Sequence, residues 1–291
     1  MKYTGPTFRP PLEANTLLLQ VTVGCAHNKC SFCTMYKETK FQIESLEQIE
    51  KDLREAKEKR PSIDRIFLVN GDAFVLSARR LKEISDKIIE VYPDIKTITM
   101  YGAVRNIKDK TDEDLEMLRK ARINELWVGI ESGHKETVTY LNKGHDLNDA
   151  YVQLERLSTF DIAFNGIFML GIAGHNKGLE NAQATAQLIN KTKPKLVGFT
   201  SLGIFKGSKL EKDYLSGDFS PATEYEILQE EKHLLNHITI EVPFYGTHPT
   251  NAANVKGILP KDRDNMLLEI DETIKIVDED FLNASANRYS L

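Results

Sequence analysis

The sequence lacks the features that mark secreted, membrane-spanning or nucleic-acid-binding proteins. Its 291 residues include only three cysteines and one tryptophan. Apolar runs such as 165–173 are far shorter than the roughly 20 residues that a membrane-spanning helix needs. The first residues, MKYTGPTFRPPLEANT, have no apolar core of the kind that a signal peptide requires. We therefore expect a cytoplasmic protein that does not enter the membrane.

An excess of positive charge is also missing. Lys and Arg together number 38 against 43 Asp and Glu, which gives a formal net charge of −5. A nucleic-acid-binding protein usually gathers a surplus of cations on one face to neutralise phosphates. The balance argues against a nucleic-acid partner, and 41% hydrophobic with 28% charged residues is typical of a soluble enzyme with a sizeable core.

The three cysteines lie together in the segment GCAHNKCSFC, as Cys25, Cys30 and Cys33. An odd, tightly clustered set is a poor disulfide framework and indicates a metal or cluster site. With His27 the three sulfurs form a set that suits tetrahedral zinc, although structural zinc sites usually draw on two separated ligand pairs. A four-iron cluster usually takes four cysteines, so three would leave one iron open for chemistry.

Strand-like and helix-like segments alternate along the chain. Amphipathic helices are predicted over 46–59, 78–92, 111–121, 147–158 and 179–191. Apolar runs rich in β-branched residues predict six strands, at 16–23, 65–69, 97–101, 125–130, 163–170 and 196–202. Six such units predict an α/β fold with a parallel sheet, a partial (β/α)6 TIM-type barrel.

The chain after the sixth strand is too short for an independent domain. It contains a predicted helix at 224–236, a strand-like run at 238–242, a loop at 243–260 and a final helix at about 261–281. We expect residues 1–210 to form the barrel core. Residues 211–291 would then be a short α/β extension that packs on the barrel and closes its open side.

The motif C-x4-C-x2-C at the end of the first strand resembles the cluster-binding loop of the radical S-adenosylmethionine (SAM) superfamily. The usual spacing there is C-x3-C-x2-C, so this chain has one extra residue between Cys25 and Cys30. The resemblance implies a [4Fe–4S] cluster held by Cys25, Cys30 and Cys33. It also implies SAM bound at the open iron, with Phe32 packed near the adenine.

The resemblance extends over about residues 8–260, because polar motifs follow successive strands. Most of these motifs can also be explained without a ligand. Residues 70–72 would then form a turn, Arg105 a surface pair and Lys143 an exposed lysine, while Gly166, Gly171 and Gly174 would serve core packing or a turn. The residues that the resemblance implies in SAM binding are Phe32, Gly71, Asp72, Tyr101, Arg105, Glu131, Ser132, Lys143 and Gly171.

The implied activity is reductive cleavage of SAM to a 5′-deoxyadenosyl radical that takes hydrogen from an unidentified small-molecule or peptide substrate. A flavodoxin or ferredoxin would supply the electron. The segments RPPLEANTLLLQVTVGC and THPTN…KGILPKD resemble an uncharacterised subgroup related to the methylthiotransferase and elongator-type branch. No catalytic side chain is identified. Candidate substrate contacts are Glu13, Tyr36, His175, His248 and Asn251.

Two other functions remain open from the sequence. A zinc-stabilised barrel with a non-radical activity would use the same cysteines, and its metal content would identify it. An iron–sulfur carrier or scaffold would hold a cluster without needing SAM.

Overall fold

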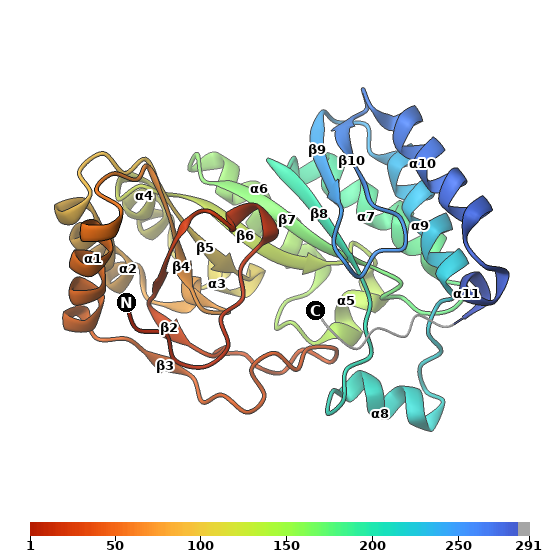
Figure 1. Ribbon diagram of the computed structural model, residues 1–291, viewed down its shortest axis with the longest axis horizontal. Coiled ribbons are helices and arrows are strands. Elements are labelled where there is room, and N and C mark those ends of the chain that lie inside the picture. The colour runs from red at the N-terminus through yellow and green to blue at the C-terminus, as the bar shows by residue number, and fades with distance from the viewer. Residues whose placement is uncertain (285–291) are drawn as a thin grey trace. The chain divides into compact units, whose positions relative to one another are not determined.

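The apolar runs of the sequence form the strands of an α/β fold, and the amphipathic runs between them form its helices (Figure 1). The computed structural model describes residues 1–284. The strands are β1 (Leu17–Gln20), β2 (Thr22–Val23), β3 (Gln42–Ile43), β4 (Arg65–Val69), β5 (Thr97–Gly102), β6 (Ile123–Glu131), β7 (Ala163–Leu170), β8 (Leu196–Ser201), β9 (Val242–Gly246) and β10 (Val255–Leu259).

The central sheet has eight strands in the order β1-β4-β5-β6-β7-β8-β9-β10. Its neighbours run parallel at β1–β4, β4–β5, β5–β6, β7–β8 and β8–β9, and β9–β10 runs antiparallel. The six predicted parallel strands are confirmed, as a partial TIM-type barrel. Within residues 1–284 the sheet stays open, and no closed barrel is formed.

Helices follow most strands. They are α1 (Leu46–Lys59), α2 (Ala78–Val91), α3 (Val104–Lys108), α4 (Asp112–Lys120), α5 (Lys135–Leu141), α6 (Leu147–Thr159), α7 (Gly178–Thr192), α8 (Lys209–Ser216), α9 (Glu224–His237), α10 (Arg263–Ile276) and α11 (Glu279–Asn283), with short 3-10 helices at Pro11–Glu13 and Ala73–Val75. Several begin at Ser or Thr caps that accept a backbone N–H bond, among them Ser45, Ser77 and Thr223.

The chain divides into two compact units. Unit 1 comprises residues 1–28, 35–128 and 153–164, and unit 2 comprises 29–34, 129–152 and residues from 165 onward. This division does not follow the predicted boundary at residue 210, which stays a prediction together with the closing role of the extension.

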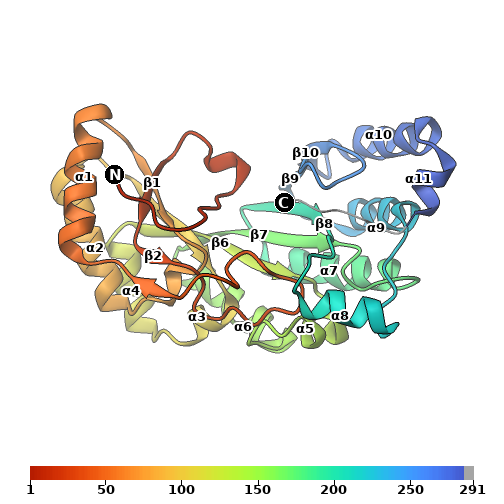
Figure 2. The ribbon, with the colours of Figure 1, turned by 60° about the horizontal axis from the view of Figure 1, so that its bottom comes forward.

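In unit 1, helices α1 and α2 pack against each other, and α2 packs against α4 (Figures 1 and 2). Their buried faces carry fully buried side chains such as Ile49, Leu53, Leu81 and Ile84. The predicted strand at 16–23 is two strands here. β1 joins the main sheet, whereas β2 pairs antiparallel with β3 in a separate two-stranded sheet.

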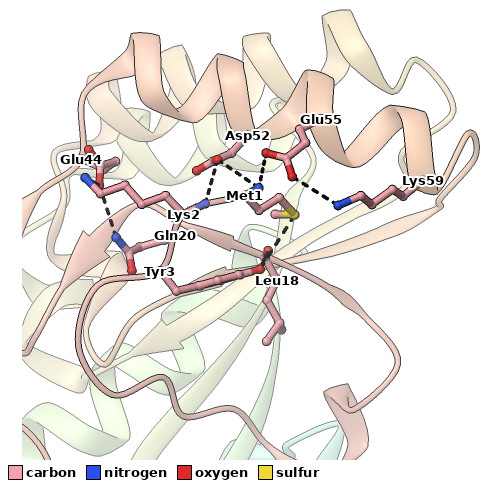
Figure 3. A network of polar contacts seen from close by, with 9 residues as sticks. All are labelled: Met1, Lys2, Tyr3, Leu18, Gln20, Glu44, Asp52, Glu55 and Lys59. Atoms are coloured by element: carbon pink, nitrogen blue, oxygen red, sulfur yellow. Dashed lines mark hydrogen bonds and ion pairs between the residues drawn. The ribbon is translucent and has the colours of Figure 1, made fainter.

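The first residues of the chain are bound to α1 and β1 (Figure 3). The Lys2 backbone N–H donates to the Asp52 carboxylate at 2.9 Å, and the Met1 amine pairs with Glu55. The Tyr3 hydroxyl donates to the Leu18 carbonyl at 2.8 Å. These contacts fix the N-terminal segment beside the first strand of the sheet.

In unit 2, helix α9 packs against α7, α10 and α11 (Figures 1 and 2). The predicted strand-like run at 238–242 and loop at 243–260 were placed wrongly, because β9 begins at Val242 and β10 lies within the expected loop. Pro243 and Gly257 disfavour a strand when read locally. Here Pro243 is exposed, and it is the second residue of β9, paired with Ile258 of β10.

Within residues 1–284, no helix combines the length and the apolar character needed to cross a membrane.

Candidate functional site

Cys25 lies in unit 1, in the turn that follows β2. Gly24 before it has a φ of +73°, and a Cβ there would lie 3.1 Å from the Thr39 carbonyl oxygen. Burial and the Asp72 carboxylate raise the pKa of the Cys25 thiol, and backbone N–H bonds from His27 and Asn28 partly oppose that rise. The same N–H groups are suited to a sulfur ligand that carries negative charge.

Cys30 and Cys33 lie in unit 2, on a short segment tied to two helices. The Ser31 N–H donates to the Leu141 carbonyl at 3.0 Å, and its carbonyl accepts from the Leu210 N–H at 2.9 Å. The Asn142 side chain donates to the Lys29 carbonyl at 3.1 Å. The end of α5 and the start of α8 therefore position these two cysteines.

All three thiols are partly exposed, and none forms a disulfide. Within residues 1–284, no three or more His, Cys, Asp or Glu side chains lie together as a metal site, and Cys25 belongs to a different unit from Cys30 and Cys33. The chemistry of the donor set fits an iron–sulfur cluster, because thiolate sulfur is its usual protein ligand and all three sulfurs remain unbridged.

The carboxyl end of β4 carries the Asn70–Gly71–Asp72 motif in unit 1. The Gly71 N–H donates to the Tyr36 hydroxyl at 3.2 Å, and a Cβ on Gly71 would lie 2.3 Å from the Tyr36 ring. Only glycine permits this approach. The buried Asp72 carboxylate forms an ion pair with the partly buried Arg105, so two residues that the sequence assigned to separate motifs contact each other.

Asn70 is the most unusual residue of this motif. Its side chain is 0% exposed, yet neither its Oδ1 nor its Nδ2 has a hydrogen-bond partner among the described residues. A buried amide without partners costs on the order of 1–3 kcal/mol. An unpartnered donor and acceptor at a strand's carboxyl end is the feature that a polar ligand would satisfy.

Tyr101 lies one residue before the end of β5, in unit 1. Its ring meets Phe67 edge-on, with centroids 5.2 Å apart, and burial raises the pKa of its hydroxyl well above the ordinary value. Its predicted contact with SAM stays a prediction.

At the end of β6, in unit 2, Glu131 and Lys143 form a buried ion pair of 2.8 Å. Burial alone would lower the pKa of Lys143, but Glu131 and the nearby Cys30 and Cys33 hold it above its ordinary value. Gly129 leaves room for the pair, since a Cβ there would lie 2.8 Å from Glu131 Oε1. The Lys143 Nζ also lies 5.6 Å from the centroid of the Phe32 ring. The ion pair, the aromatic ring and two cysteines are therefore neighbours within one unit.

Phe32 also contacts a hydrophobic cluster of unit 2, made of Leu141, Ile172, Leu202 and Leu210. Its predicted place beside adenine stays a prediction.

Ser132 and Gly171 belong to one hydrogen-bonded chain in unit 2. The Ser132 hydroxyl donates to Asn181 Oδ1 at 2.5 Å, and Asn181 Nδ2 donates to Glu230 Oε1 at 2.6 Å. The Gly171 N–H donates to Glu230 Oε2 at 2.8 Å. Burial raises the pKa of Glu230 to about 7. Sequence reasoning missed Asn181 and Glu230, because nothing local distinguishes them from other polar residues of amphipathic helices.

The candidate substrate contacts lie in different settings. Glu13 is buried and bonded to Arg65, Thr16 and Trp127, whereas Tyr36 supports Gly71. In unit 2, His175 pairs with Glu226, and His248 Nδ1 lies 2.7 Å from Thr250 Oγ1. Asn251 is buried and donates to the Phe199 and Gly246 carbonyls at 3.0 and 2.7 Å. Glu13, Tyr36 and Asn251 thus have clear structural partners.

Comparison with known proteins identifies the family of this chain. Residues 19–187 match the family model of the radical SAM superfamily. An uncharacterised protein of Methanocaldococcus jannaschii is 26% identical over 251 residues, covering 82% of this chain and 74% of that protein. The heme chaperone HemW of Bacillus subtilis is 26% identical over 170 residues, which cover 56% of this chain and 44% of HemW.

Solved structures share the fold at low sequence identity. Methylornithine synthase (PylB) aligns with a TM-score of 0.57 and 14% identity, covering 88% of this chain and 68% of that one. The archaeal Elp3 of Methanocaldococcus infernus aligns with a TM-score of 0.54 and 15% identity, over 79% of this chain and 59% of that one. Identities this low support the fold alone.

Proposed function

Because this chain belongs to the radical SAM superfamily, whose members use SAM and a [4Fe–4S] cluster, we propose that it cleaves SAM reductively and acts on a small-molecule or peptide substrate. The observation that carries the proposal is the set of three unbridged cysteines in a chain whose family match spans residues 19–187. When bound, the cluster supplies the electron that converts SAM to methionine and a 5′-deoxyadenosyl radical, which takes a hydrogen atom from the substrate.

Cys25, Cys30 and Cys33 would hold the cluster as thiolates. The Lys143 ammonium beside Cys30 and Cys33 favours the negative charge of those two ligands. At Cys25, two backbone N–H groups partly offset the opposing effects of burial and of the Asp72 carboxylate. Three sulfur ligands would leave one iron without a protein ligand, and this is the position that SAM would occupy.

SAM brings an ammonium, a carboxylate and a sulfonium, so its site needs both charges and amide groups. In unit 2 the Glu131–Lys143 pair offers a carboxylate and an ammonium that are already desolvated. In unit 1, Asn70 offers an unpartnered amide, and Asp72, held by Arg105, offers a carboxylate. These groups match the polar groups of SAM in kind. Phe32, Gly71, Tyr101, Ser132 and Gly171 complete the proposed set.

The substrate and the electron donor are proposals as well. A flavodoxin or a ferredoxin would reduce the cluster, and the site would act in the cytoplasm. No observation on the described residues favours the zinc-stabilised or carrier functions.

The test is anaerobic reconstitution with iron and sulfide, followed by dithionite and SAM, with 5′-deoxyadenosine measured by chromatography. We expect 5′-deoxyadenosine from the wild type and none from Cys25→Ala, Cys30→Ala or Cys33→Ala. His27→Ala is the matched control. It changes the fourth member of a zinc set within the same loop, and it should retain iron and SAM cleavage. Bound zinc in place of iron, lost in His27→Ala, would overturn the proposal.

A further inference from the structure

Glu131, the last residue of β6, has a backbone conformation that its side chain does not favour. Its φ is +71°, in the left-handed region that non-glycine residues rarely adopt. Such strain persists only where the surrounding structure holds it, and it is concentrated at functional sites. From this conformation Glu131 forms its buried ion pair with Lys143. Whatever holds residues 132–134 in place therefore also determines where the Glu131 carboxylate lies.

Two connections hold residues 132–134, and both lead to helix α7. The Gly133 N–H donates to Thr185 Oγ1 at 2.9 Å, and a Cβ on Gly133 would lie 2.4 Å from the Ala184 carbonyl oxygen. Ser132 Oγ accepts from the His134 N–H at 2.9 Å and donates to Asn181 Oδ1 at 2.5 Å. The loop after β6 is thus fixed directly against the first turns of α7.

The second connection continues to α9, which lies outside the matched residues 19–187. Asn181 Nδ2 donates to Glu230 Oε1, and the Gly171 N–H donates to Glu230 Oε2. All donors point along the chain toward Glu230, so its carboxylate is the final acceptor. One side chain therefore joins the loop after β6 to the turn after β7, where Gly171 has a φ of +75°.

We propose that Glu230 is a positioning residue for SAM, which through Asn181 and Ser132 holds Glu131 in the left-handed conformation that pairs it with Lys143. This inference rests on the proposed function, since it assigns the Glu131–Lys143 pair to SAM. Glu230 itself does not contact SAM. Its role is to fix the positions of the loops after β6 and β7 relative to each other. Glu230 thereby extends the site beyond the segment that the family model matches.

The variant Glu230→Gln tests this directly. Gly171 N–H and Asn181 Nδ2 each donate to a different oxygen of the Glu230 carboxylate. In a glutamine one of these oxygens is replaced by an NH2 group, which cannot accept from the donor that faces it. The structure offers a matched control in the next residue, because Glu231 is equally buried on the same helix and its Oε1 accepts no hydrogen bond within residues 1–284. Glu231→Gln makes the same chemical change without touching the chain to Ser132.

The measurement is the SAM dissociation constant of the anaerobically reconstituted protein, together with iron content and Tm. We expect Glu230→Gln to raise the dissociation constant about tenfold, the equivalent of about one buried hydrogen bond. Iron content should stay at the wild-type level. Glu231→Gln should leave the SAM affinity unchanged. If a general loss of stability in helix α9 were the cause, both variants would weaken SAM binding.

A second variant keeps the proposal testable if Glu230→Gln folds poorly. Asn181→Leu removes the link between Ser132 and Glu230 with a side chain of similar size, and it should weaken SAM to a similar degree. In the double variant the two losses should not add, because both break the same chain. Additive losses, or wild-type affinity in both single variants, would overturn the positioning role. A wild-type protein that neither binds nor cleaves SAM would instead overturn the proposed function and this inference together.

Discussion

The polar groups at the two ends of strand β4 differ in whether they have hydrogen-bond partners. At its amino end, Arg65 donates to Glu13 and to Glu125 at 2.5 and 2.6 Å, and the Trp127 indole donates to Glu13 at 2.9 Å. At its carboxyl end, the Asn70 side chain is fully buried and has no hydrogen-bond partner within residues 1–284. In barrels of this type the amino ends of the strands serve stability and the carboxyl ends serve chemistry. The contrast within one strand agrees with that division.

Burial alone does not identify a functional polar residue. Glu13 was a candidate substrate contact in the sequence, yet the structure gives its carboxylate three side-chain partners. Asn70 was interpreted as part of a motif or as a turn, and its unpartnered amide makes it a stronger ligand candidate than its neighbours.

Removing the Arg65 cation at the amino end of β4 should have the largest effect on the stability of the fold. Arg65→Ala leaves the Glu13 and Glu125 carboxylates buried without their shared partner, which should destabilise the fold by about 3–5 kcal/mol. Guanidinium denaturation measures the loss. Lys82→Ala, which removes a pair with Asp86 on the exposed face of α2, is the control and should change little. Equal losses in both variants would contradict a structural role for the Arg65 cluster.

Removing the polar group of Asn70 at the carboxyl end of β4 should weaken SAM binding and leave the stability of the fold intact. Asn70→Leu replaces an unpartnered amide by an apolar side chain of similar size, so the free energy of unfolding should stay level or rise. SAM should bind about 10- to 100-fold more weakly, because a hydrogen bond to a charged group contributes about 1.5–3 kcal/mol. Calorimetry on the reconstituted protein measures the affinity. Lower stability with unchanged SAM affinity would place Asn70 with the structural residues.

Glu231, on helix α9, carries another buried oxygen without a hydrogen-bond partner within residues 1–284, and a Cβ on Gly246 would lie 2.9 Å from this Oε1. Burial, and then the Glu230 carboxylate, raise the pKa of Glu231 to about 8, so a proton satisfies this group. The folded protein then holds a proton that the unfolded chain releases near pH 4.5. Stability from this group is complete below that pH and is lost as the pH rises through about 8.

Glu231→Gln should therefore match the wild type near pH 4.5 and exceed it at pH 9, by at least about 1.4 kcal/mol, the equivalent of one pKa unit. Denaturation curves at the two pH values measure the difference. A constant offset between the two proteins at both pH values would show that Glu231 does not titrate on unfolding in this range.

The smallest expected effect belongs to Tyr36→Phe. This change removes only the hydroxyl that accepts from the Gly71 N–H at 3.2 Å and keeps the ring that fills the space beside Gly71. We expect a loss of about 1 kcal/mol in stability and a minor change in SAM affinity. A loss of SAM binding as large as that of Asn70→Leu would mean that the loop backbone, and not the Asn70 amide, determines affinity.

The strand and helix pattern was predictable because it depends on local periodicity. Helix α1 begins and ends at the predicted residues 46 and 59, and the six parallel strands lie within a few residues of their predicted positions. The strands β9 and β10 were not predictable. Pro243 and Gly257 lower the local strand propensity, and the pairing of β9 with β8 joins residues about 47 positions apart, as at Val197 and Phe244.

The candidate site was predictable only as a set of residue types. The cysteines and the polar residues after each strand follow from the sequence. Their partners depend on contacts between distant segments, such as Arg105 with Asp72 and Ser132 with Asn181. The burial of Lys143 could not be predicted either, because a lysine in a turn-like segment such as NKGH is more often exposed, and only the fold gives it Glu131 as partner.

The most direct test of the central claim is the electron paramagnetic resonance spectrum of the dithionite-reduced, reconstituted protein with and without SAM. The account predicts the signal of a reduced [4Fe–4S] cluster whose shape changes when SAM is added, since SAM would occupy the iron that the three cysteines leave open. An iron-free protein, or a cluster spectrum that saturating SAM leaves unchanged, would contradict it.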